Sequence, residues 1–328
     1  MRSFRRSVLL AVVFLLSPTL LLGLPGHGSL ASAVQILFER AAEQALGESP
    51  VELNGYVRGT FYLGKTPGSQ GTELKSGYGE GALKLRVRLE RFGDAFAEVR
   101  FRNGYEFGSS LSEITLREAY VNAYVGPLDF RVGHQIVVWG RADGINPTDN
   151  ITPKNMLARS PEEDDRREAN FLIRAACHVH PLRFEAIWIP TYRSSYIPVD
   201  LFPYPSGVTL GEPDYPGPAL KNSAFAFRAN LELASFDGSV SYFNGHNPFP
   251  GISAEVKALA FPDFSLKVFP KSYRMHVLGL DFQSVLWGKL GLRAEAAYRR
   301  PHRDYRSHVH IPHPDLQLVL GAEREFPG

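Results

Sequence analysis

A strict two-residue alternation of apolar and charged side chains is the feature that most limits how this chain can fold. In residues 83–90, leucine and valine at the odd positions alternate with lysine, arginine and glutamate at the even ones. The same pattern returns at residues 97–102 and 128–133. A period of two belongs to a β-strand with one apolar and one polar face, because a helix repeats every 3.6 residues. The chain is therefore expected to be built from strands.

About twelve segments carry this alternation, some less regularly than others. They are residues 53–63, 83–90, 97–102, 114–125, 128–133, 171–180, 182–188, 225–233, 238–243, 272–283, 290–298 and 316–326. We expect strands of about 9–11 residues, the length that a tilted strand needs to cross a bilayer.

The connections between these segments alternate in length. Short joints are expected at residues 92–94, 126–127, 180–181, 235–237 and 287–289, and long ones at 64–80, 103–113, 139–170, 190–221, 244–271 and 300–315. Short turns at one end and long loops at the other are typical of outer-membrane barrels. A soluble β-sandwich is the alternative, but rows of arginine and glutamate fit a wet lumen better. The expected fold is all-β: a transmembrane antiparallel up-and-down β-barrel of about twelve strands, complete or truncated.

The N-terminal 33 residues have the order of a secretory signal peptide. Three arginines precede an apolar run from Val8 to Leu16, and Ala31-Ser32-Ala33 forms a cleavage site. A membrane anchor is the rival interpretation, but Ser17-Pro18 interrupts the run before it reaches about 20 apolar residues. The expected organisation is a signal peptide (1–33), a short periplasmic segment of helical character (34–50) and an outer-membrane barrel (51–328).

Composition excludes several classes of function. Cleavage after Ala33 removes three arginines and no acid, which turns the net charge from +2 to −1. Nucleic-acid binding is not expected without a basic excess. A single cysteine excludes a disulfide framework and CxxC sites. No GxSxG, HExxH or GxxxxGK[ST] motif occurs, so neither an enzyme nor a cofactor or metal is expected.

The charged face of the strands supplies the candidate pore-lining residues. They are Lys84, Arg86, Arg88, Glu98, Arg100, Arg102, Glu118, Arg131, Arg174, Arg228, Glu232, Arg293 and Glu295. A joint at residues 92–94 would place Arg88 opposite Glu98 and Arg86 opposite Arg100. The charged side chains either form a basic ladder that favours the passage of anions or neutralise one another in a network that stiffens the barrel wall. Acids are nearly as frequent as bases on this face, which favours the network.

One region resembles a known family. Leu116, Arg117, Glu118 and Tyr120 are followed by Arg131, Gly133 and Gln135, then by Trp139, Gly140, Ala142, Asp143, Gly144, Asn146 and Pro147. With residues 184–198, this order resembles the porin-like family of proteobacterial outer-membrane β-barrel proteins that is catalogued as a domain of unknown function. The resemblance implies an outer-membrane barrel of porin type and implies no substrate.

Residues 139–147 are expected where a strand leaves the membrane, with Trp139 as an interfacial aromatic. They form either a fold-defining corner, in which Arg141 and Asp143 bridge the loop base, or a constricting loop in which Arg141, Asp143 and Asn146 set selectivity. The acidic stretch 158–170, the histidines of 302–313 and the proline-rich 190–218 are expected as external loops. Cation binding, a surface zinc or copper site and sugar stacking are their respective alternatives.

The sequence thus predicts a Gram-negative outer-membrane porin that passes small polar solutes by passive diffusion, with a bias toward anions if the ladder hypothesis holds. A non-conducting barrel serving as a surface scaffold or receptor is the alternative. The expected partners are outer-membrane lipid and lipopolysaccharide and the barrel-assembly machinery. The sequence does not indicate an oligomeric state.

Overall fold

The computed structural model describes residues 51–65, 70–88, 92–142, 144–160, 162–201, 204–258, 264–286, 289–303 and 305–324. The predicted signal peptide (1–33) and periplasmic segment (34–50) lie outside these residues, as does Asp143. No helix among the described residues is long and apolar enough to cross a membrane.

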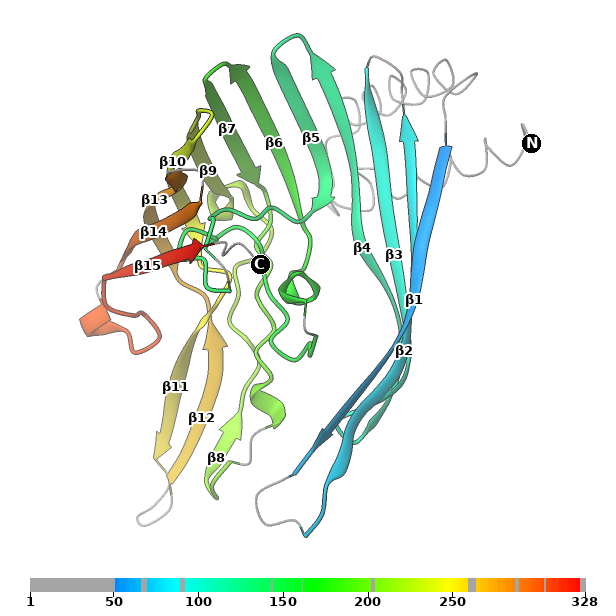
Figure 1. Cartoon of the computed structure of the whole chain (residues 1–328). Coiled ribbons are helices and arrows are strands. Elements are labelled where there is room, and N and C mark those ends of the chain that lie inside the picture. Colours follow the sequence, from blue (N-terminus) through cyan, green and yellow to red (C-terminus); the bar gives the residue numbers. More distant parts are fainter. Residues whose placement is uncertain are drawn as a thin grey trace, which may run out of the picture. The chain divides into compact units, whose positions relative to one another are not determined.

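Twelve strands form one sheet whose members follow one another largely in chain order (Figure 1). Their bounds are β1 Val51–Gly64, β2 Glu73–Arg88, β3 Gly93–Glu106, β4 Ser109–Val125, β5 Leu128–Gln135, β6 Asn170–Val179, β7 Leu182–Ile189, β9 Ala224–Glu232, β10 Phe236–His246, β13 Arg274–Leu286, β14 Leu290–Pro301 and β15 Asp315–Arg324. The adjacent pairs with a described register are antiparallel. The predicted antiparallel up-and-down sheet of about twelve strands is confirmed, and each strand contains or overlaps one predicted segment.

The first four strands are longer than expected, with 14, 16, 14 and 17 residues. The predicted long connections 64–80 and 103–113 are wrong, because β2 begins at Glu73 and β3 runs to Glu106. Glycines at 77, 79 and 81 hide the alternation of β2. β3 and β4 are joined by Phe107 and Gly108 alone, and both have positive φ, as a tight hairpin turn requires.

Two of the long loops fold into a second sheet that the sequence analysis missed. It contains β8 (Val208–Leu210), β11 (Gly251–Ala258) and β12 (Phe264–Lys271), with β12 antiparallel to β11 and parallel to β8. A two-residue alternation was present in Ile252-x-Ala254-x-Val256 and would have indicated β11. Four short 3₁₀ turns complete the elements: Glu163–Arg166, Val199–Leu201, Leu220–Asn222 and Tyr305–Ser307.

The chain divides into two compact units. The first contains β1–β4 with Arg131–Gln135, and the second contains Gly126–Phe130 and the chain from Ile136 onward. The second unit has a buried apolar cluster in which Trp139 and Ile151 from a connection pack with Leu172, Ile187 and Phe243 from strands. The segment that follows β5 therefore packs on one face of the strands of its own unit.

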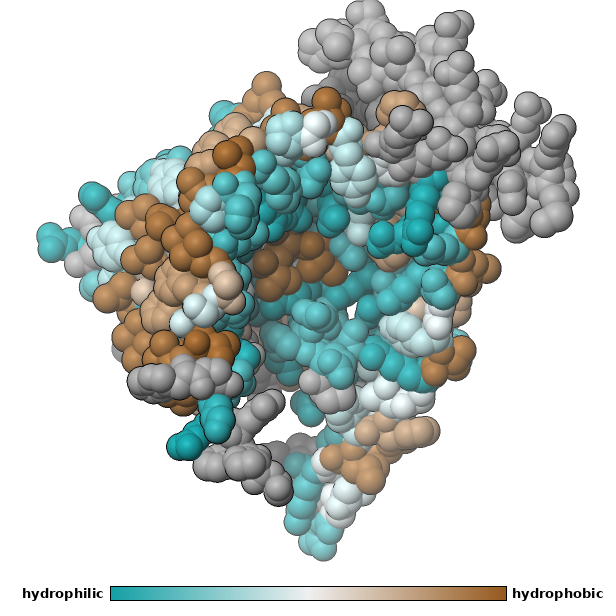
Figure 2. All heavy atoms as spheres, turned by 45° about the horizontal axis from the view of Figure 1, so that its top comes forward, coloured by the Kyte–Doolittle hydropathy of each residue, from teal (hydrophilic) through white to brown (hydrophobic). Residues whose placement is uncertain are grey.

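Burial on these strands is the reverse of that in a soluble protein. In the first unit Val57 is 89% exposed and Phe61 75%, whereas the side chain of Glu80 is 3% exposed. In the second unit Leu316 is 70% exposed and Glu295 only 1%. Figure 2 shows apolar side chains gathered along one face of the strands and hydrophilic ones on the other. Charges face inward and hydrocarbon faces outward, which is the pattern of strands surrounded by lipid.

Candidate functional site

The polar face of the first unit is organised around buried carboxylates. Glu80 accepts hydrogen bonds from the Tyr56 hydroxyl at 2.7 Å and lies 2.8 Å from an Arg58 nitrogen and 3.2 Å from Arg102 Nε. The Arg102 guanidinium also lies over the Tyr78 ring, 4.1 Å from its centroid. Each arginine is thus held by a carboxylate, and Arg102 also by an aromatic face.

Two further carboxylates near the start of β3 also hold several polar side chains in place. Glu98 lies 2.6 Å from Arg100 Nε and 3.5 Å from Lys84 Nζ. Asp94 accepts from the Asn122 amide at 3.0 Å and from the Tyr124 hydroxyl at 2.7 Å, with Arg86 at 3.6 Å. The charges on this face are therefore cross-linked in a network between strands.

The predicted pairing of this hairpin is wrong. Arg88 lies opposite Asp94 and Lys84 opposite Glu98, while Arg86 faces Phe96 rather than Arg100. The cause is Gly93, which belongs to β3 and not to the turn. Its φ is +154°, and a Cβ there would lie 1.9 Å from the Asn122 carbonyl oxygen, so glycine is needed for the close approach of β4.

The two signs of charge are not equally exposed to water on this face. The side chains of Lys84, Arg86 and Arg88 are 38%, 42% and 58% exposed. Those of Glu98 and Asp94 are only 6% and 10% exposed. Lys84 and Arg86 are therefore more open to solvent than the carboxylates near them, and an approaching ion meets these cationic groups first. Arg88 pairs with Glu52, which lies 2.6 Å away and is 38% exposed.

The second unit has a comparable centre at Glu185 of β7. Its carboxylate pairs with Arg174 and lies 3.2 Å from Arg183, and it accepts from the Trp139 indole nitrogen at 2.8 Å. Trp139 is 2% exposed. The expectation of an interfacial aromatic is wrong, because the indole turns toward the polar face, where a carboxylate takes its hydrogen bond.

The segment after Trp139 is fastened to β14 by one carboxylate. Glu295 Oε2 accepts from the backbone nitrogens of Arg141 and Ala142 at 3.0 and 3.1 Å, and Oε1 accepts from the Thr148 nitrogen and hydroxyl at 2.8 and 2.9 Å. Gly140 permits this arrangement, since its φ is +99° and a Cβ would lie 2.5 Å from the Glu295 carboxylate. We call residues 139–148 the inner loop.

Arg141 fixes the inner loop to two more strands. Its guanidinium makes a two-pronged contact with Asp237 at 2.7 and 2.8 Å, and its Nε lies 2.5 Å from Asp281. Arg228 also binds Asp281, at 3.0 and 3.1 Å, and donates to Ser239. Both cations are mostly buried in these contacts. Arg141 thus clamps the inner loop to β10 and β13, while the predicted bridge to Asp143 involves a residue outside the described part of the chain.

The chain beyond the inner loop is held by a buried ion pair. Asp149 pairs with Arg167, and both side chains are nearly inaccessible. Burial raises the pKa of Asp149 to about 6, against the opposing effect of Arg167. Because the folded-state pKa is raised, protonation stabilises this segment as pH falls from about 6 toward 4. The nearby acids of 158–170 pair locally: Glu163 with Lys154 and Arg166, and Asp164 with Arg167.

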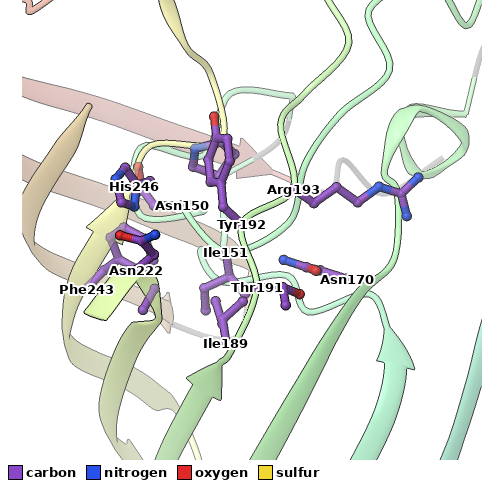
Figure 3. Close-up of a pocket in the computed structure, with 12 residues that line it drawn as sticks. Asn150, Ile151, Asn170, Ile189, Thr191, Tyr192, Arg193, Asn222, Phe243 and His246 are labelled. Carbon is purple, nitrogen blue, oxygen red and sulfur yellow. The ribbon is translucent and has the colours of Figure 1, made fainter. Parts of the chain in front are cut away.

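A small cavity lies among the loops of the second unit. Its volume is about 20 Å³, room for roughly one water molecule. Figure 3 shows Asn150, Tyr192, Asn222 and His246 around it. Tyr192 also packs edge-on against Tyr215, with ring centroids 5.5 Å apart, and burial raises the pKa of its phenol. These contacts favour the packing interpretation of the proline-rich loop over sugar stacking.

The remaining predicted residues take varied positions. Arg131 Nε donates to Asn122 at 2.7 Å, Glu118 faces Glu98 across the strand pair, and Arg293 pairs with exposed Glu323. Glu232 is exposed, and the Asn146 amide turns toward the carbonyls of its own loop. Asp143 lies outside the described residues.

Of the histidines, His308 and His310 are neighbours, but no metal-binding group of three residues occurs in the described part of the chain.

Sequence analysis missed the carboxylates that organise the face. Glu80, Asp94, Glu185, Asp237 and Asp281 all lie on the polar side of their strands. A strict count of alternate positions from Arg183 would have found Glu185 on the same strand. Glu295 was expected to line a pore, and its position beneath the inner loop could not be read from β14 alone.

Comparison with known proteins adds the following. No family model and no curated protein matches the chain. Among solved structures, the chain is similar to a bacterial porin and to two other bacterial proteins, one of them an outer-membrane protein. It aligns with a triple mutant of the Rhodopseudomonas blastica porin at 11% identity, over 85% of this chain and 91% of that one, with a TM-score of 0.35.

Two other solved structures align with the chain at similarly low sequence identity and TM-score. OmpT, an outer-membrane protein of Vibrio cholerae, gives 10% identity over 85% of each chain and a TM-score of 0.33. OprB of Pseudomonas putida gives 11% identity over 77% of this chain and 66% of that one, with a TM-score of 0.37. Likeness at this level carries no weight for function, which we infer from the geometry of the chain itself. The resemblance to the family of unknown function stays a prediction.

Proposed function

We propose that the chain is an outer-membrane channel for small polar solutes. The observation that carries this proposal is the reversed burial of the strands, with carboxylates such as Glu80 and Glu295 enclosed and Val57 and Leu316 exposed. A soluble β-sandwich has no reason to present such a surface, whereas lipid requires it. In this proposal the twelve-stranded sheet closes into a barrel, since an open edge is not tolerated in hydrocarbon.

The charged face supports a channel over an inert scaffold. A face that is rich in arginine and carboxylate is stable inside a membrane only if it meets water or is fully neutralised. Lys84, Arg86 and Arg88 remain partly open to solvent, which supports a hydrated interior. Because these exposed groups are cations, we propose that the channel favours anions. Export through the cleaved signal peptide and delivery by the barrel-assembly machinery are parts of the same proposal.

Purified, heat-modifiable protein is expected to produce single-channel current steps in a planar lipid bilayer. The reversal potential in a salt gradient should lie on the anion-selective side, because the bases of β2 lie nearer to water than their carboxylates. Addition of empty detergent micelles is the control. Insertion into the bilayer without current steps would support the scaffold alternative and reject the channel.

Leu318→Arg is expected to block folding into membranes, whereas Gln317→Arg on the same strand is expected to be tolerated. Leu318 is 62% exposed on the apolar face, and Gln317 is its immediate neighbour on the opposite face. An arginine facing lipid near the middle of a bilayer costs about 2–4 kcal/mol, and one facing water costs little. Folding into vesicles, followed by the mobility shift between heated and unheated samples, measures the difference. Equal folding of the two variants would contradict the proposed lipid-facing side.

A further inference from the structure

A groove opens on the apolar face of the second unit. Its volume is about 460 Å³, with Phe184, Phe227 and Leu278 at its walls and Ala186 and Ala229 between them. Strand alternation places these five side chains opposite the charged face that contains Glu185 and Arg228. The groove belongs to the side that the proposed function turns toward lipid, and its dimensions and apolar walls suit a hydrocarbon chain.

The groove ends where the exposed face becomes polar. Across β10, β13 and β14, Tyr242 pairs with Leu278, which pairs with Tyr298. Two positions further along, Asn244 pairs with His276, and His276 with Arg300. Tyrosines followed by polar residues mark the level of lipid headgroups, because the ring lies in hydrocarbon and the hydroxyl in water. Tyr242 lines the groove and therefore connects it to this boundary.

Three cations lie at this end of the strands: Lys221 just before β9, Arg274 on β13 and Arg300 on β14, which we call the basic ledge. Arg274 donates to the carbonyls of Lys221 at 2.8 Å and Ser223 at 3.1 Å. Lys221 and Arg300 are exposed. No acidic side chain among the described residues pairs with any of the three, although most other arginines of this unit have such a partner. The basic ledge therefore carries positive charge that the protein itself leaves uncompensated.

Two stacked histidines, His276 and His302, also lie at this boundary. His276 and His302 stack with ring centroids 4.1 Å apart, and the Tyr242 hydroxyl lies 2.7 Å from His276 Nδ1. Burial, together with the nearby His276 and Arg274, lowers the pKa of His302. The lowered pKa disfavours the charged form of His302, so the positive charge considered below is that of the lysine and the two arginines.

We propose that the basic ledge and the groove together bind lipopolysaccharide, with its phosphates at Arg300 and at Lys221 and an acyl chain in the groove. This rests on the proposed function only in that the exposed face must lie in outer-membrane lipid. Guanidinium and ammonium groups bind phosphate by charge-assisted hydrogen bonds. A glycolipid that carries phosphates beside acyl chains satisfies both features at once, whereas a zwitterionic phospholipid brings its own cation to the basic ledge.

The test is lipopolysaccharide binding by two variants of the full chain. Lys221→Gln with Arg300→Gln is expected to weaken binding roughly tenfold by loss of two phosphate contacts, as measured by native mass spectrometry of protein folded in detergent and titrated with lipopolysaccharide. Ala229→Phe fills the groove and should weaken binding while leaving the charges in place. The matched controls are Lys289→Gln with Arg324→Gln at the other end of the strands, and Ala296→Phe on the same face outside the groove.

The outcomes separate the site from the channel. Unchanged binding by the two test variants would overturn the proposed site, and so would equal losses in test and control variants. Inorganic phosphate should compete poorly, because it cannot occupy the groove; full displacement by it would show that the basic ledge acts alone and would overturn the combined site. Heat-modifiability and single-channel current are recorded on the same samples, so a failed channel with intact lipid binding rejects only the proposed function.

Discussion

Replacing Glu295 with alanine is expected to enlarge the channel current and make it noisier. The Glu295 carboxylate accepts three backbone N–H groups and the Thr148 hydroxyl, and these four hydrogen bonds tie the described part of the inner loop to β14. Hydrogen bonds to a buried charged group contribute about 1.5–3 kcal/mol each and are not additive, so we expect the loop to lose about 3–5 kcal/mol of local stability. In the proposed channel the inner loop occupies part of the polar interior, and its release widens the path.

Single-channel recording and thermal unfolding measure this effect together. The control is Glu323→Ala, which removes a carboxylate from the adjacent strand β15 where it pairs only with Arg293 at the surface. That variant should conduct like the parent protein, because exposed ion pairs contribute little. If Glu295→Ala has the conductance and current noise of the parent protein, the inner loop does not narrow the channel.

Neutralising the three exposed bases of β2 is expected to remove most of the anion preference. The variant is Lys84→Gln with Arg86→Gln and Arg88→Gln, whose side chains lie nearer to water than Glu98 and Asp94 do. A unit charge about 5 Å from an ion in water contributes about 0.8 kcal/mol, and salt screening reduces this to a few tenths. Three such charges change the ratio of anion to cation permeability by roughly fivefold.

The reversal potential in a salt gradient reports that ratio directly. A control with the same change in net charge is Lys267→Gln, Lys271→Gln and Lys289→Gln, which lie on β12 and beside a short turn and not on β2. The control should keep the preference of the parent protein. An equal shift in both variants would mean that net charge, and not the position of the bases on β2, sets selectivity.

Sequence reasoning located the strands well where alternation was regular and failed where small residues interrupted it. β5 and β7 begin at their predicted starts, because charged residues alternate there with large apolar ones, and β6 begins one residue before its predicted start. The sequence predicted that β2 begins only at Leu83, because Gly77 and Gly79 carry no side chain that would show which face of the strand is apolar. The second sheet was missed because its strands were taken for loop in spite of their alternation.

The pattern of the chain by itself determined which face of each strand of the main sheet is apolar, how many strands that sheet has and that the apolar face is the exposed one. These properties are local, since a period of two places every second side chain on one side whatever the partner strand is. Only the tertiary structure decided the register and the partner of each charge. Gly93 lies in β3 against the Asn122 carbonyl of β4, and Glu295 binds the backbone of Arg141 across a separation of 154 residues. From the strand alone, a carboxylate such as Glu295 is predicted to line the wall of the pore; only the tertiary structure shows that another segment folds over it. The free energy of that contact depends on how deeply it is buried, which no local sequence pattern records.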